Sequence, residues 1–366
     1  MADEAANRNA FSIQQHYCQE MDAPIYAALS AAIATGLTRR TRTGARVLDW
    51  PGEPTRDALP LRLIGGLHAL VLAGEDERLA RVFDGTTRDE SAIADAVEAA
   101  LARHDGAVYP WLDGPPQTNE AGRSGALMTG LIEVAQRHGP RLELIEIGSS
   151  AGLNLLIDRY GFDLGGTSVG PRDAPVVIRP DWAGDPPLPT PIEIVSTRGC
   201  DIAPLDATDP AVEARLSAYV WAEARARMAR LRGGIAMMRE RGVDLVAADA
   251  ADWVEAQLAV PQAAGTTRVL MHSVVWQYLP DETAERIRTA MLAAAARADD
   301  MRPLAWVAME PDRALAHQVI RVRSWPGHGD WHVVGTAHAH GAWIRRGPID
   351  PARDGIVLPD TAKVTL

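Results

Sequence analysis

Residues 141–160 have the sequence RLELIEIGSSAGLNLLIDRY, and this stretch decides the fold class. Its first part is apolar in the pattern of a buried strand, and a glycine-rich turn, Gly148–Gly152, follows directly. Leu153, Leu156 and Ile157 then have the spacing of one face of a helix. A strand, a tight turn and a helix N-terminus together predict a site where backbone N–H groups approach a ligand closely.

Glu146 stands at the end of the predicted strand, two residues before the first glycine. A carboxylate at this place suits a ligand with hydroxyl or ammonium groups better than a ligand with phosphates. The turn also lacks two of the three glycines of the dinucleotide motif G-x-G-x-x-G, because Ser150 and Leu153 stand in their places. The stretch therefore predicts S-adenosylmethionine as the ligand rather than a dinucleotide.

The same turn also matches G-x-S-x-G, the nucleophile elbow of serine hydrolases. Ser150 is the nucleophile in this second interpretation. Its partners follow in the order acid and then histidine: Glu310 or Asp312, and His338 or His340. Residues before 138 have helical spacing, whereas α/β-hydrolases place several strands before the elbow. The hydrolase is therefore kept as an alternative.

The composition is that of an ordinary globular protein, with 47% hydrophobic and 23% charged residues in a chain of 366. A net charge of −11 argues against a general nucleic-acid binder, because phosphate contacts need a basic surface. Cys18 and Cys200 are too few for a disulfide framework or a cysteine metal site. Four late histidines lack acid or cysteine partners at fixed spacing, so no metal is expected: His328, His332, His338 and His340.

The N-terminal residues MADEAANRNA are polar and include acids, unlike a secretory signal. The longest apolar stretch, residues 61–73, is shorter than the roughly 18 residues of a membrane span. We therefore expect a cytoplasmic protein without a membrane segment. The arginine runs near residues 39–46 and 225–232 are expected to be solvated surface.

The chain changes character near residue 138. Before it, apolar spacing predicts a helical N-terminal region, residues 1–138, with helices at 24–37, 59–72, 91–104 and 119–138. After it, strands are predicted at 142–147, 192–197, 243–247, 268–272 and 304–309. A long helix is expected after the second strand, with Asp209 as its N-cap and Pro210 at its first position.

Two further strands, 319–324 and 331–337, are joined by residues 325–330 and predict an antiparallel hairpin. The order predicts an α/β protein with a Rossmann-like methyltransferase fold at 139–366, whose mostly parallel sheet ends in that hairpin. An insert at about 161–191 separates the first two strands. A lid, a β-hairpin and an interaction surface remain open for it.

In an open α/β sheet the ligand lies across the carboxyl ends of the strands. Asp201 follows the second strand and suits the ribose hydroxyls, and Asp249 follows the third and suits the adenine amino group. A helix N-cap or a loop acid is the alternative for each. The predicted cofactor site comprises Glu146, Gly148, Ser149, Ser150, Gly152, Asn154, Asp201, Asp249 and Ala250.

The fourth predicted strand ends in His272, where the methyl acceptor is expected to dock beside Trp276 and Tyr278. His272 is the first candidate base and Glu310, at the end of the fifth strand, the second. A structural histidine with both ring nitrogens satisfied is the alternative. The Asn/Asp-Pro-Pro-aromatic motif of amino-group DNA methylases is absent, so DNA is a poor candidate substrate.

Several segments form a specific set along the chain: QTNE at 117–120 with Arg123, EIGSSAGLNLL at 146–156, DRY at 158–160, RGCD at 198–201, PLD at 204–206, DAADW at 249–253 and HS at 272–273. In these segments the chain resembles the bacterial domain-of-unknown-function 2332 family, over nearly its whole length. The resemblance implies a methyltransferase-like fold without an established reaction. It also directs attention to Thr118, and to Asn119, Glu120 and Arg123 as substrate-binding residues. The alternative is that Thr118, with the acid that follows it, caps a helix.

The sequence thus predicts an S-adenosylmethionine-dependent methyltransferase that acts on a small molecule or a limited protein target. A non-catalytic cofactor-binding protein of the same fold is the first alternative. A serine hydrolase using Ser150 is the second. The sequence does not indicate an oligomeric state.

Overall fold

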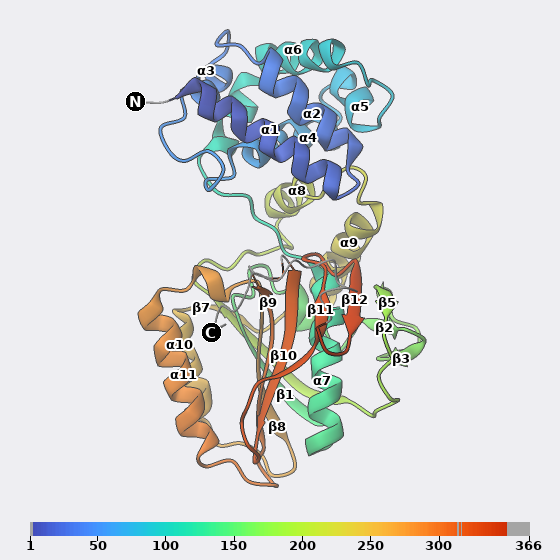
Figure 1. Cartoon of the computed structure of the whole chain (residues 1–366), viewed down its shortest axis with the longest axis vertical. Coiled ribbons are helices and arrows are strands. Elements are labelled where there is room, and N and C mark those ends of the chain that lie inside the picture. Colours follow the sequence, from blue (N-terminus) through green and yellow to red (C-terminus); the bar gives the residue numbers. More distant parts are fainter. Residues whose placement is uncertain (1–2, 313–314, 316, 350–366) are drawn as a thin grey trace. The chain divides into compact units, whose positions relative to one another are not determined.

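The computed structural model describes residues 3–312, 315 and 317–349. Contacts within the chain divide it into two compact units. The helical unit contains the chain up to 118 together with 209–229, and the sheet unit contains 119–208 and the chain from 230 onward. This division differs from the expected boundary at 138, because residues 119–138 belong with the sheet and residues 209–229 return to the helices. Figure 1 shows the course of the chain by colour.

The helical unit is built from short amphipathic helices. They are α1 (Glu4–Glu20), α2 (Pro24–Gly36), α3 (Arg42–Leu48), α4 (Leu59–Leu72), α5 (Glu77–Phe83), α6 (Glu90–Val108) and α8 (Pro210–Ala218), with the 3₁₀-helix η1 (Tyr109–Leu112) after α6. Aspartate side chains accept first-turn N–H groups at several helix starts: Asp3, Asp76, Asp89 and Asp209. The helices predicted at 24–37, 59–72 and 91–104 are confirmed.

The core of the helical unit contains a buried histidine. His68 on α4 lies within hydrogen-bond distance of the Tyr26 hydroxyl, 3.1 Å, and of the Ala218 carbonyl oxygen, 3.0 Å. Its ring also stacks on Phe83, with centroids 4.8 Å apart. Burial lowers the pKa of His68 from 6.5 to about 4. The histidine is therefore neutral in the folded protein near neutral pH.

We expect the replacement His68→Gln to make the helical unit less sensitive to acid. Between pH 6.5 and 4 the unfolded chain binds a proton at His68 that the folded chain does not. Acid therefore lowers the free energy of unfolding of the wild type, by about 3 kcal/mol over the whole range. Urea unfolding at pH 7 and pH 4.5 measures this difference. Equal acid sensitivity in the two proteins contradicts the prediction.

The sheet unit is a mixed α/β structure. Its main sheet, in the described part of the chain, runs in the order β5-β12-β11-β10-β9-β8-β1-β6-β7. The strands are β1 (Arg141–Ile147), β5 (Asp181–Ala183), β6 (Glu193–Asp201), β7 (Leu245–Ala247), β8 (Thr267–Ser273), β9 (Leu304–Asp312), β10 (His317–Trp325), β11 (His332–Ala337) and β12 (Trp343–Arg346). Five neighbouring strands, β7, β6, β1, β8 and β9, are parallel, so their carboxyl ends meet at one edge of the sheet.

The other side of this sheet is an antiparallel edge. Strands β9, β10, β11 and β12 pair antiparallel in succession, and β5 joins β12 in parallel. The predicted hairpin between 319–324 and 331–337 is confirmed as β10 and β11. Strand β12 was not predicted. The sheet is thus mostly parallel, with a mixed edge that extends further than one hairpin.

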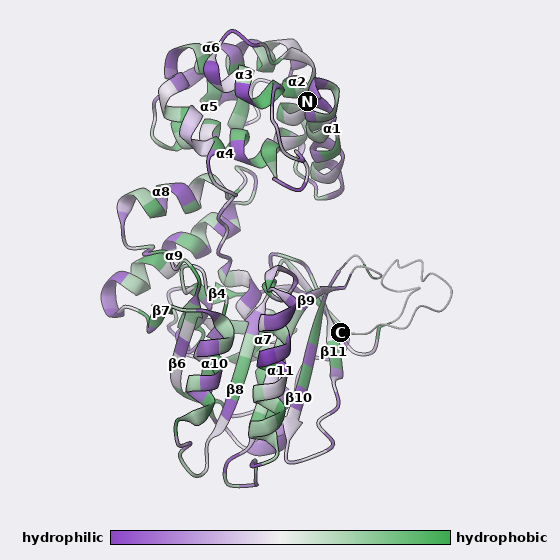
Figure 2. Ribbon diagram, turned by 90° about the vertical axis from the view of Figure 1, so that its left-hand side faces the viewer, coloured by the Kyte–Doolittle hydropathy of each residue, from purple (hydrophilic) through white to green (hydrophobic). Residues whose placement is uncertain are grey.

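Helices cover both faces of the sheet. Helix α7 (Ser124–His138) packs on β8, β9 and β10, and α10 (Ala250–Ala259) packs on β1 and β6 beside α11 (Asp281–Ala295). Figure 1 shows α7 on one side of the strands and the α10–α11 pair on the other. These helices carry both purple and green stretches in Figure 2, as expected for helices with one face on a sheet. Among the described residues, no helix is long and apolar enough to cross a membrane.

Two helix predictions are wrong in detail. The long helix expected after the second strand is two helices, α8 and α9 (Arg225–Arg241), although Asp209 caps the first as predicted. The helix expected after the glycine turn is only a 3₁₀-helix, η3 (Leu153–Leu156). In an α-helix the Ile157 N–H would donate to the Leu153 carbonyl. Here the Tyr160 hydroxyl donates to that carbonyl at 2.8 Å, and the Ile157 N–H donates to the Asn154 carbonyl instead, at 3.1 Å.

The insert at 161–191 contains four short strands joined by turns and loops. The chain makes a small sheet in the order β3-β2-β4, from β2 (Gly161–Leu164), β3 (Thr167–Val169) and β4 (Val177–Ile178), before adding β5 to the main sheet. β2 and β3 pair antiparallel, which agrees with the β-hairpin, one of the three structures expected for this insert. The crossover from β1 to β6 thus contains no α-helix within these described residues.

Candidate functional site

A buried carboxylate lies at the carboxyl end of β1. Glu146 is 1% exposed, and its Oε1 accepts a hydrogen bond from Asn154 Nδ2 at 2.9 Å. Its Oε2 is also buried and has no hydrogen-bond partner among the described residues. Burial raises the pKa of Glu146 from 4.5 to about 7, against the opposing effects of the Asn154 and Ser149 side chains and the Arg123 charge. The first expected site residue is therefore a carboxyl group with one unused oxygen.

Asn154 connects this carboxylate to a neighbouring strand and helix. Its Nδ2 lies 3.3 Å from the Ser273 Oγ at the end of β8, and its Oδ1 accepts from the Ser124 Oγ of α7 at 2.9 Å. Strand β8 pairs directly with β1, opposite Glu146. We call Glu146, Asn154, Ser124 and Ser273 the Glu146 cluster. All four side chains are buried.

The glycine turn uses its own backbone donors within the fold. The Ser149 N–H donates to the Cys200 carbonyl at 3.0 Å, and the Ser150 N–H donates to Asp201 Oδ2 at 2.8 Å. The Leu153 N–H donates to Asn119 Oδ1 at 2.9 Å. The expectation that free first-turn N–H groups face a ligand is therefore wrong for these positions.

The turn's conformation explains Gly148. Its φ is +67°, and a Cβ there would lie 2.3 Å from Val275 Cγ2. Gly152 has a φ of +81°, and Ser150 also has a positive φ, +55°. The turn is thus left-handed at three positions and closed on one side by the segment after β8.

The two other expected acids also lie at the carboxyl edge. Asp201 ends β6. Its carboxylate accepts hydrogen bonds from the Ser150 N–H of the turn and, at 2.9 Å, from the Ala203 N–H of the loop after β6. Asp249 follows β7 and caps α10, where its Oδ1 accepts from the Ala251 N–H at 2.8 Å. Ala250 is the first residue of that helix. Both acids therefore have the local structural role that was kept as their alternative, and both remain partly exposed.

The two candidate bases form a second group, bonded to each other. His272 Nδ1 lies 2.6 Å from Glu310 Oε1, and His272 Nε2 accepts from the Trp306 Nε1–H at 2.9 Å. Trp276 stacks on the histidine, with ring centroids 5.2 Å apart. Both ring nitrogens of His272 are thus occupied, as in the structural alternative stated for it. We call His272, Glu310, Trp306 and Trp276 the His272 cluster.

The two clusters lie on opposite faces of the sheet. Ile145, Ile147, Leu270 and Trp306 belong to the core that also contains residues of α10 and α11. Side chains of a strand point to the two faces of the sheet in turn, so residues an even number of positions away share a face. His272 is two positions from Leu270 and Glu310 four from Trp306, so both share the face of that core, whereas Glu146 lies between the two isoleucines and points to the other face. The His272 cluster therefore faces α10 and α11, and the Glu146 cluster faces α7.

The residues expected to bind the substrate do not form one group, and each has its own partners or surroundings. Asn119 supports the turn by donating its Nδ2 to the Ser149 carbonyl at 3.3 Å, in addition to its bond with Leu153. Glu120 is buried, caps η2 (Ala121–Arg123) and lies 3.3 Å from Arg230. Arg123 donates to the Ala339 carbonyl. Tyr278 is 73% exposed.

Sequence reasoning did not select three residues of these clusters as site residues. Ser124 and Ser273 have ordinary sequence surroundings, and no spacing rule connects them to Asn154. Trp306 is the one large aromatic residue in a strand of smaller apolar residues, which is a weak signal. Only the pairing of β8 with β9 places it beside His272.

Ser150 has the left-handed backbone of a nucleophile elbow, with a φ of +55°, but two other features of an elbow are missing around it. The α-helix that should follow it is replaced by η3, and no hydrogen bond joins its hydroxyl to a histidine in the described part of the chain. Glu310 bonds to His272, and Asp312 accepts from Arg321 at 2.8 Å. Across the described residues there is also no group of three or more His, Cys, Asp or Glu side chains that could hold a metal.

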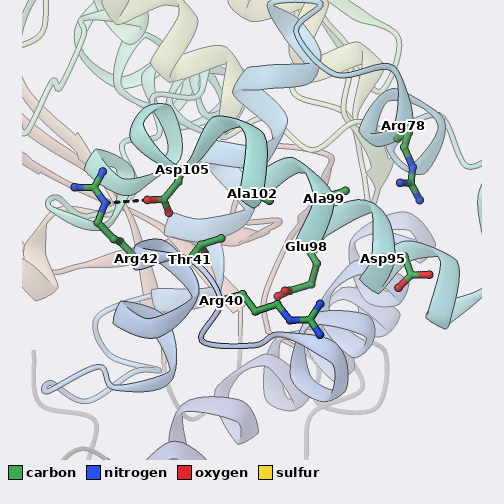
Figure 3. Close-up of a pocket in the computed structure, with 9 residues that line it drawn as sticks. All are labelled: Arg40, Thr41, Arg42, Arg78, Asp95, Glu98, Ala99, Ala102 and Asp105. Carbon is green, nitrogen blue, oxygen red and sulfur yellow. Dashed lines mark hydrogen bonds and ion pairs between the residues drawn. The ribbon is translucent and has the colours of Figure 1, made fainter.

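A separate polar cavity lies in the helical unit (Figure 3). It has a volume of about 640 Å³ and is lined by residues of α6 and of the segment that begins α3, together with Arg78. Two of its acids are bonded within the chain: Asp105 pairs with Arg42 at 2.9 Å, and Glu98 accepts from Thr38. We assign it no ligand, because its charges of both signs balance.

The chain was compared with protein-family models, curated proteins and solved structures. The family model described as "Uncharacterized protein conserved in bacteria (DUF2332)" matches residues 8–346. No curated protein and no solved structure gives a significant match. The family match spans both the helical unit and the glycine turn with its two clusters. The chain therefore belongs to the DUF2332 family of uncharacterised bacterial proteins.

Proposed function

We propose that the protein is an S-adenosylmethionine-dependent methyltransferase with a Rossmann-like fold. The observation that carries the proposal is the position of the Glu146 cluster. From β1 the chain continues to β6 and β7 on one side, while β8 and β9 lie on the other, so the strand order reverses between β1 and β8. Open α/β sheets bind their ligands at the carboxyl ends of strands at such a switch point. Asn154 joins Glu146 on β1 to Ser273 on β8 there.

The electrostatics of this edge favour a cationic ligand with hydroxyl groups. Backbone N–H groups at Ser149, Ser150 and Leu153 are bonded within the chain, so they are not available to a phosphate. Carboxylates follow β1, β6 and β7 instead. S-adenosylmethionine carries an ammonium, a sulfonium, a ribose diol and an adenine amino group, all of which interact favourably with acidic acceptors.

The residues present fit this ligand. Glu146 has a buried oxygen without a partner, which an ammonium donor satisfies. We propose that Asp201 accepts hydrogen bonds from the ribose hydroxyls and Asp249 from the adenine amino group. The order of their strands outward from the switch point supports this assignment. When bound, the cofactor supplies an electrophilic methyl group. The chain's own contribution is to orient the reactants and to exclude water.

We expect Asp249→Asn to weaken S-adenosylmethionine binding by about tenfold, as measured by calorimetric titration. The Asp249 Oδ1 caps α10, while its Oδ2 has no hydrogen bond among the described residues. Asparagine keeps the cap but puts an NH₂ donor where the adenine amino group needs an acceptor. The loss of one charged hydrogen bond corresponds to about 1.5 kcal/mol, or roughly tenfold.

Asp209→Asn is the matched control, because Asp209 caps α8 through the Ala211 N–H at 2.7 Å in the same way. We expect this variant to bind the cofactor as the wild type does, with a similar small change in melting temperature in both variants. Equal effects on binding contradict the proposed role of Asp249. No binding of S-adenosylmethionine or of its demethylated product to the wild type refutes the methyltransferase.

Two outcomes separate the alternatives. Cofactor binding without methylation of any acceptor in a broad metabolite extract favours the non-catalytic cofactor-binding protein. Labelling of Ser150 by a fluorophosphonate probe, abolished by Ser150→Ala, favours the serine hydrolase. We expect binding and methyl transfer, without labelling.

A further inference from the structure

We propose that the methyl acceptor is a cationic amine, held by the Oε2 atom of Glu310. This inference rests on the proposed methyltransferase function and adds the chemical class of its second substrate. His272 and Trp306 are positioning residues in this arrangement, because they fix the carboxylate without touching the acceptor. The site is the His272 cluster, on the α10–α11 face of the sheet. It adjoins the glycine turn at the carboxyl edge through Val275, which donates its N–H to Glu310 and packs against Gly148.

The hydrogen bonds determine which nitrogen of His272 carries the proton. An indole nitrogen only donates, so Trp306 Nε1–H makes His272 Nε2 an acceptor at 2.9 Å. The proton of a neutral ring is therefore on Nδ1, which donates to Glu310 Oε1 at 2.6 Å. His272 is thus a neutral donor in this state and cannot serve as the base. This corrects the order of the two candidates, because Glu310 is the group that remains.

The two oxygens of Glu310 have different surroundings. Oε1 accepts from His272 and also from the Val275 N–H at 3.1 Å. Oε2 is buried and has no hydrogen-bond partner among the described residues, in a side chain that is 5% exposed overall. A buried acceptor without a donor costs about 1–3 kcal/mol. Neither donor to Oε1 is a cation when His272 is neutral, so a cationic ligand at Oε2 supplies both the missing donor and the missing charge.

Neighbouring strands provide a second buried polar atom on the same face. Glu310 on β9 pairs with Val319 on β10, which pairs in turn with Thr336 on β11. The Thr336 hydroxyl is buried and also lacks a partner among the described residues. Antiparallel partners share a face, so a carboxylate, an apolar residue and a hydroxyl lie in one row. Trp276 stacks on His272, and the Arg288 guanidinium lies over the Trp276 ring, 5.2 Å from its centroid.

A carboxylate at this place performs the proton step that an amine acceptor requires. An ammonium has no lone pair on nitrogen, so it must lose a proton before it attacks a methyl group. The N–H bond breaks, its electron pair remains on nitrogen, and the proton forms an O–H bond with Glu310 Oε2. The bonds from His272 and Val275 hold Oε1 meanwhile, so the carboxyl group keeps its orientation.

Benzylamine is a suitable probe, because it combines an ammonium with a compact aromatic ring. We expect wild-type protein to bind benzylamine in a calorimetric titration, both alone and with S-adenosylhomocysteine present, and not to bind benzoate. We expect Glu310→Gln to weaken benzylamine binding at least about tenfold, since it removes the charge but keeps the shape. The control Glu143→Gln removes a carboxylate that pairs with Arg268 elsewhere on the sheet, and we expect no change.

Histidine ¹⁵N NMR tests the positioning roles separately. We expect a wild-type His272 spectrum with the proton on Nδ1, and in Trp306→Phe a mixture of tautomers with several-fold weaker benzylamine binding. Cofactor affinity should change less than twofold in both Glu310→Gln and Trp306→Phe, because the hydrogen bonds of these two side chains, within the described residues, do not reach the Glu146 cluster. A folded Trp306→Phe variant that keeps the Nδ1 tautomer contradicts the positioning role.

The outcomes distinguish this inference from the function on which it rests. Cofactor binding without benzylamine binding, or with equal binding to wild type and Glu310→Gln, overturns the amine site and leaves the methyltransferase standing. Benzylamine binding that depends on Glu310, in a protein that does not bind the cofactor, overturns the methyltransferase and shows an amine-binding site of another kind.

Discussion

Replacing Gly148 by alanine should lower the free energy of unfolding by about 3 kcal/mol. An L-residue at its φ of +67° costs about 1–2 kcal/mol. The added Cβ would also lie 2.3 Å from Val275 Cγ2 and 2.7 Å from Val275 Cβ, which forces the segment after β8 to move. Overpacking of this kind costs about 1–3 kcal/mol. Urea unfolding followed by circular dichroism measures the sum.

Gly242→Ala is the control for the backbone contribution. Gly242 has a similar φ, +75°, but no atom lies within 4 Å of a Cβ built there. We expect this variant to lose only about 1 kcal/mol. The difference between the two variants measures the contact with Val275. Equal losses contradict the close packing of Val275 on the turn.

The contact also has a functional consequence. Val275 donates its N–H to Glu310, so a shift of Val275 alters the support of the proposed amine site as well as the turn. We therefore expect Gly148→Ala to weaken both benzylamine and cofactor binding, whereas Gly242→Ala should change neither. This single glycine connects the two sites that lie on opposite faces of the sheet.

The variant Glu146→Gln should remove a dependence of stability on pH. Burial raises the pKa of Glu146 from 4.5 to about 7, so between these values the folded protein holds a proton that the unfolded chain has lost. The free energy of unfolding of the wild type therefore falls as pH rises through this range, by about 3 kcal/mol in total. Glutamine is neutral throughout, and above pH 7 the variant should be the more stable protein by about this amount.

Urea unfolding of both proteins at half-unit steps from pH 4.5 to 8 measures the effect. The difference between variant and wild type isolates Glu146, because the other titrating groups are common to both. The sign is opposite to that of His68, whose burial makes acid destabilising. A difference that stays constant over this range shows that Glu146 titrates normally. A saturating cationic cofactor should reduce the difference, because it stabilises the charged carboxylate.

Much of the sheet could be predicted from the sequence. Strands at 142–147, 192–197, 268–272, 304–309, 319–324 and 331–337 were all found within a few residues of their predicted bounds. Their apolar patterns are local and survive in any tertiary context. Asp209 as an N-cap was equally local, because the residue bonds to the N–H groups that follow it.

The helix after the glycine turn could not be predicted correctly, since its length depends on a side chain that lies beyond it. The sequence 153–157 has helical spacing, but the Tyr160 hydroxyl donates to the Leu153 carbonyl, which an α-helix would pair with the Ile157 N–H. The division of the chain depends on distant packing in the same way. Helix α7 has the pattern of the earlier helices, and only its packing on β8, β9 and β10 places it with the sheet.

By itself the sequence determined the strands, the glycine turn and the acids at strand ends, because periodicity and spacing are properties of neighbouring residues. Only the tertiary structure decided what those acids do. Glu146 and Glu310 both follow the pattern of a strand-end carboxylate, yet the pairing register puts them on opposite faces. Which oxygen of each stays without a donor is set by Asn154, His272 and Val275. Hydrogen bonds are directional and short, so folding must bring these residues together before their chemistry is defined.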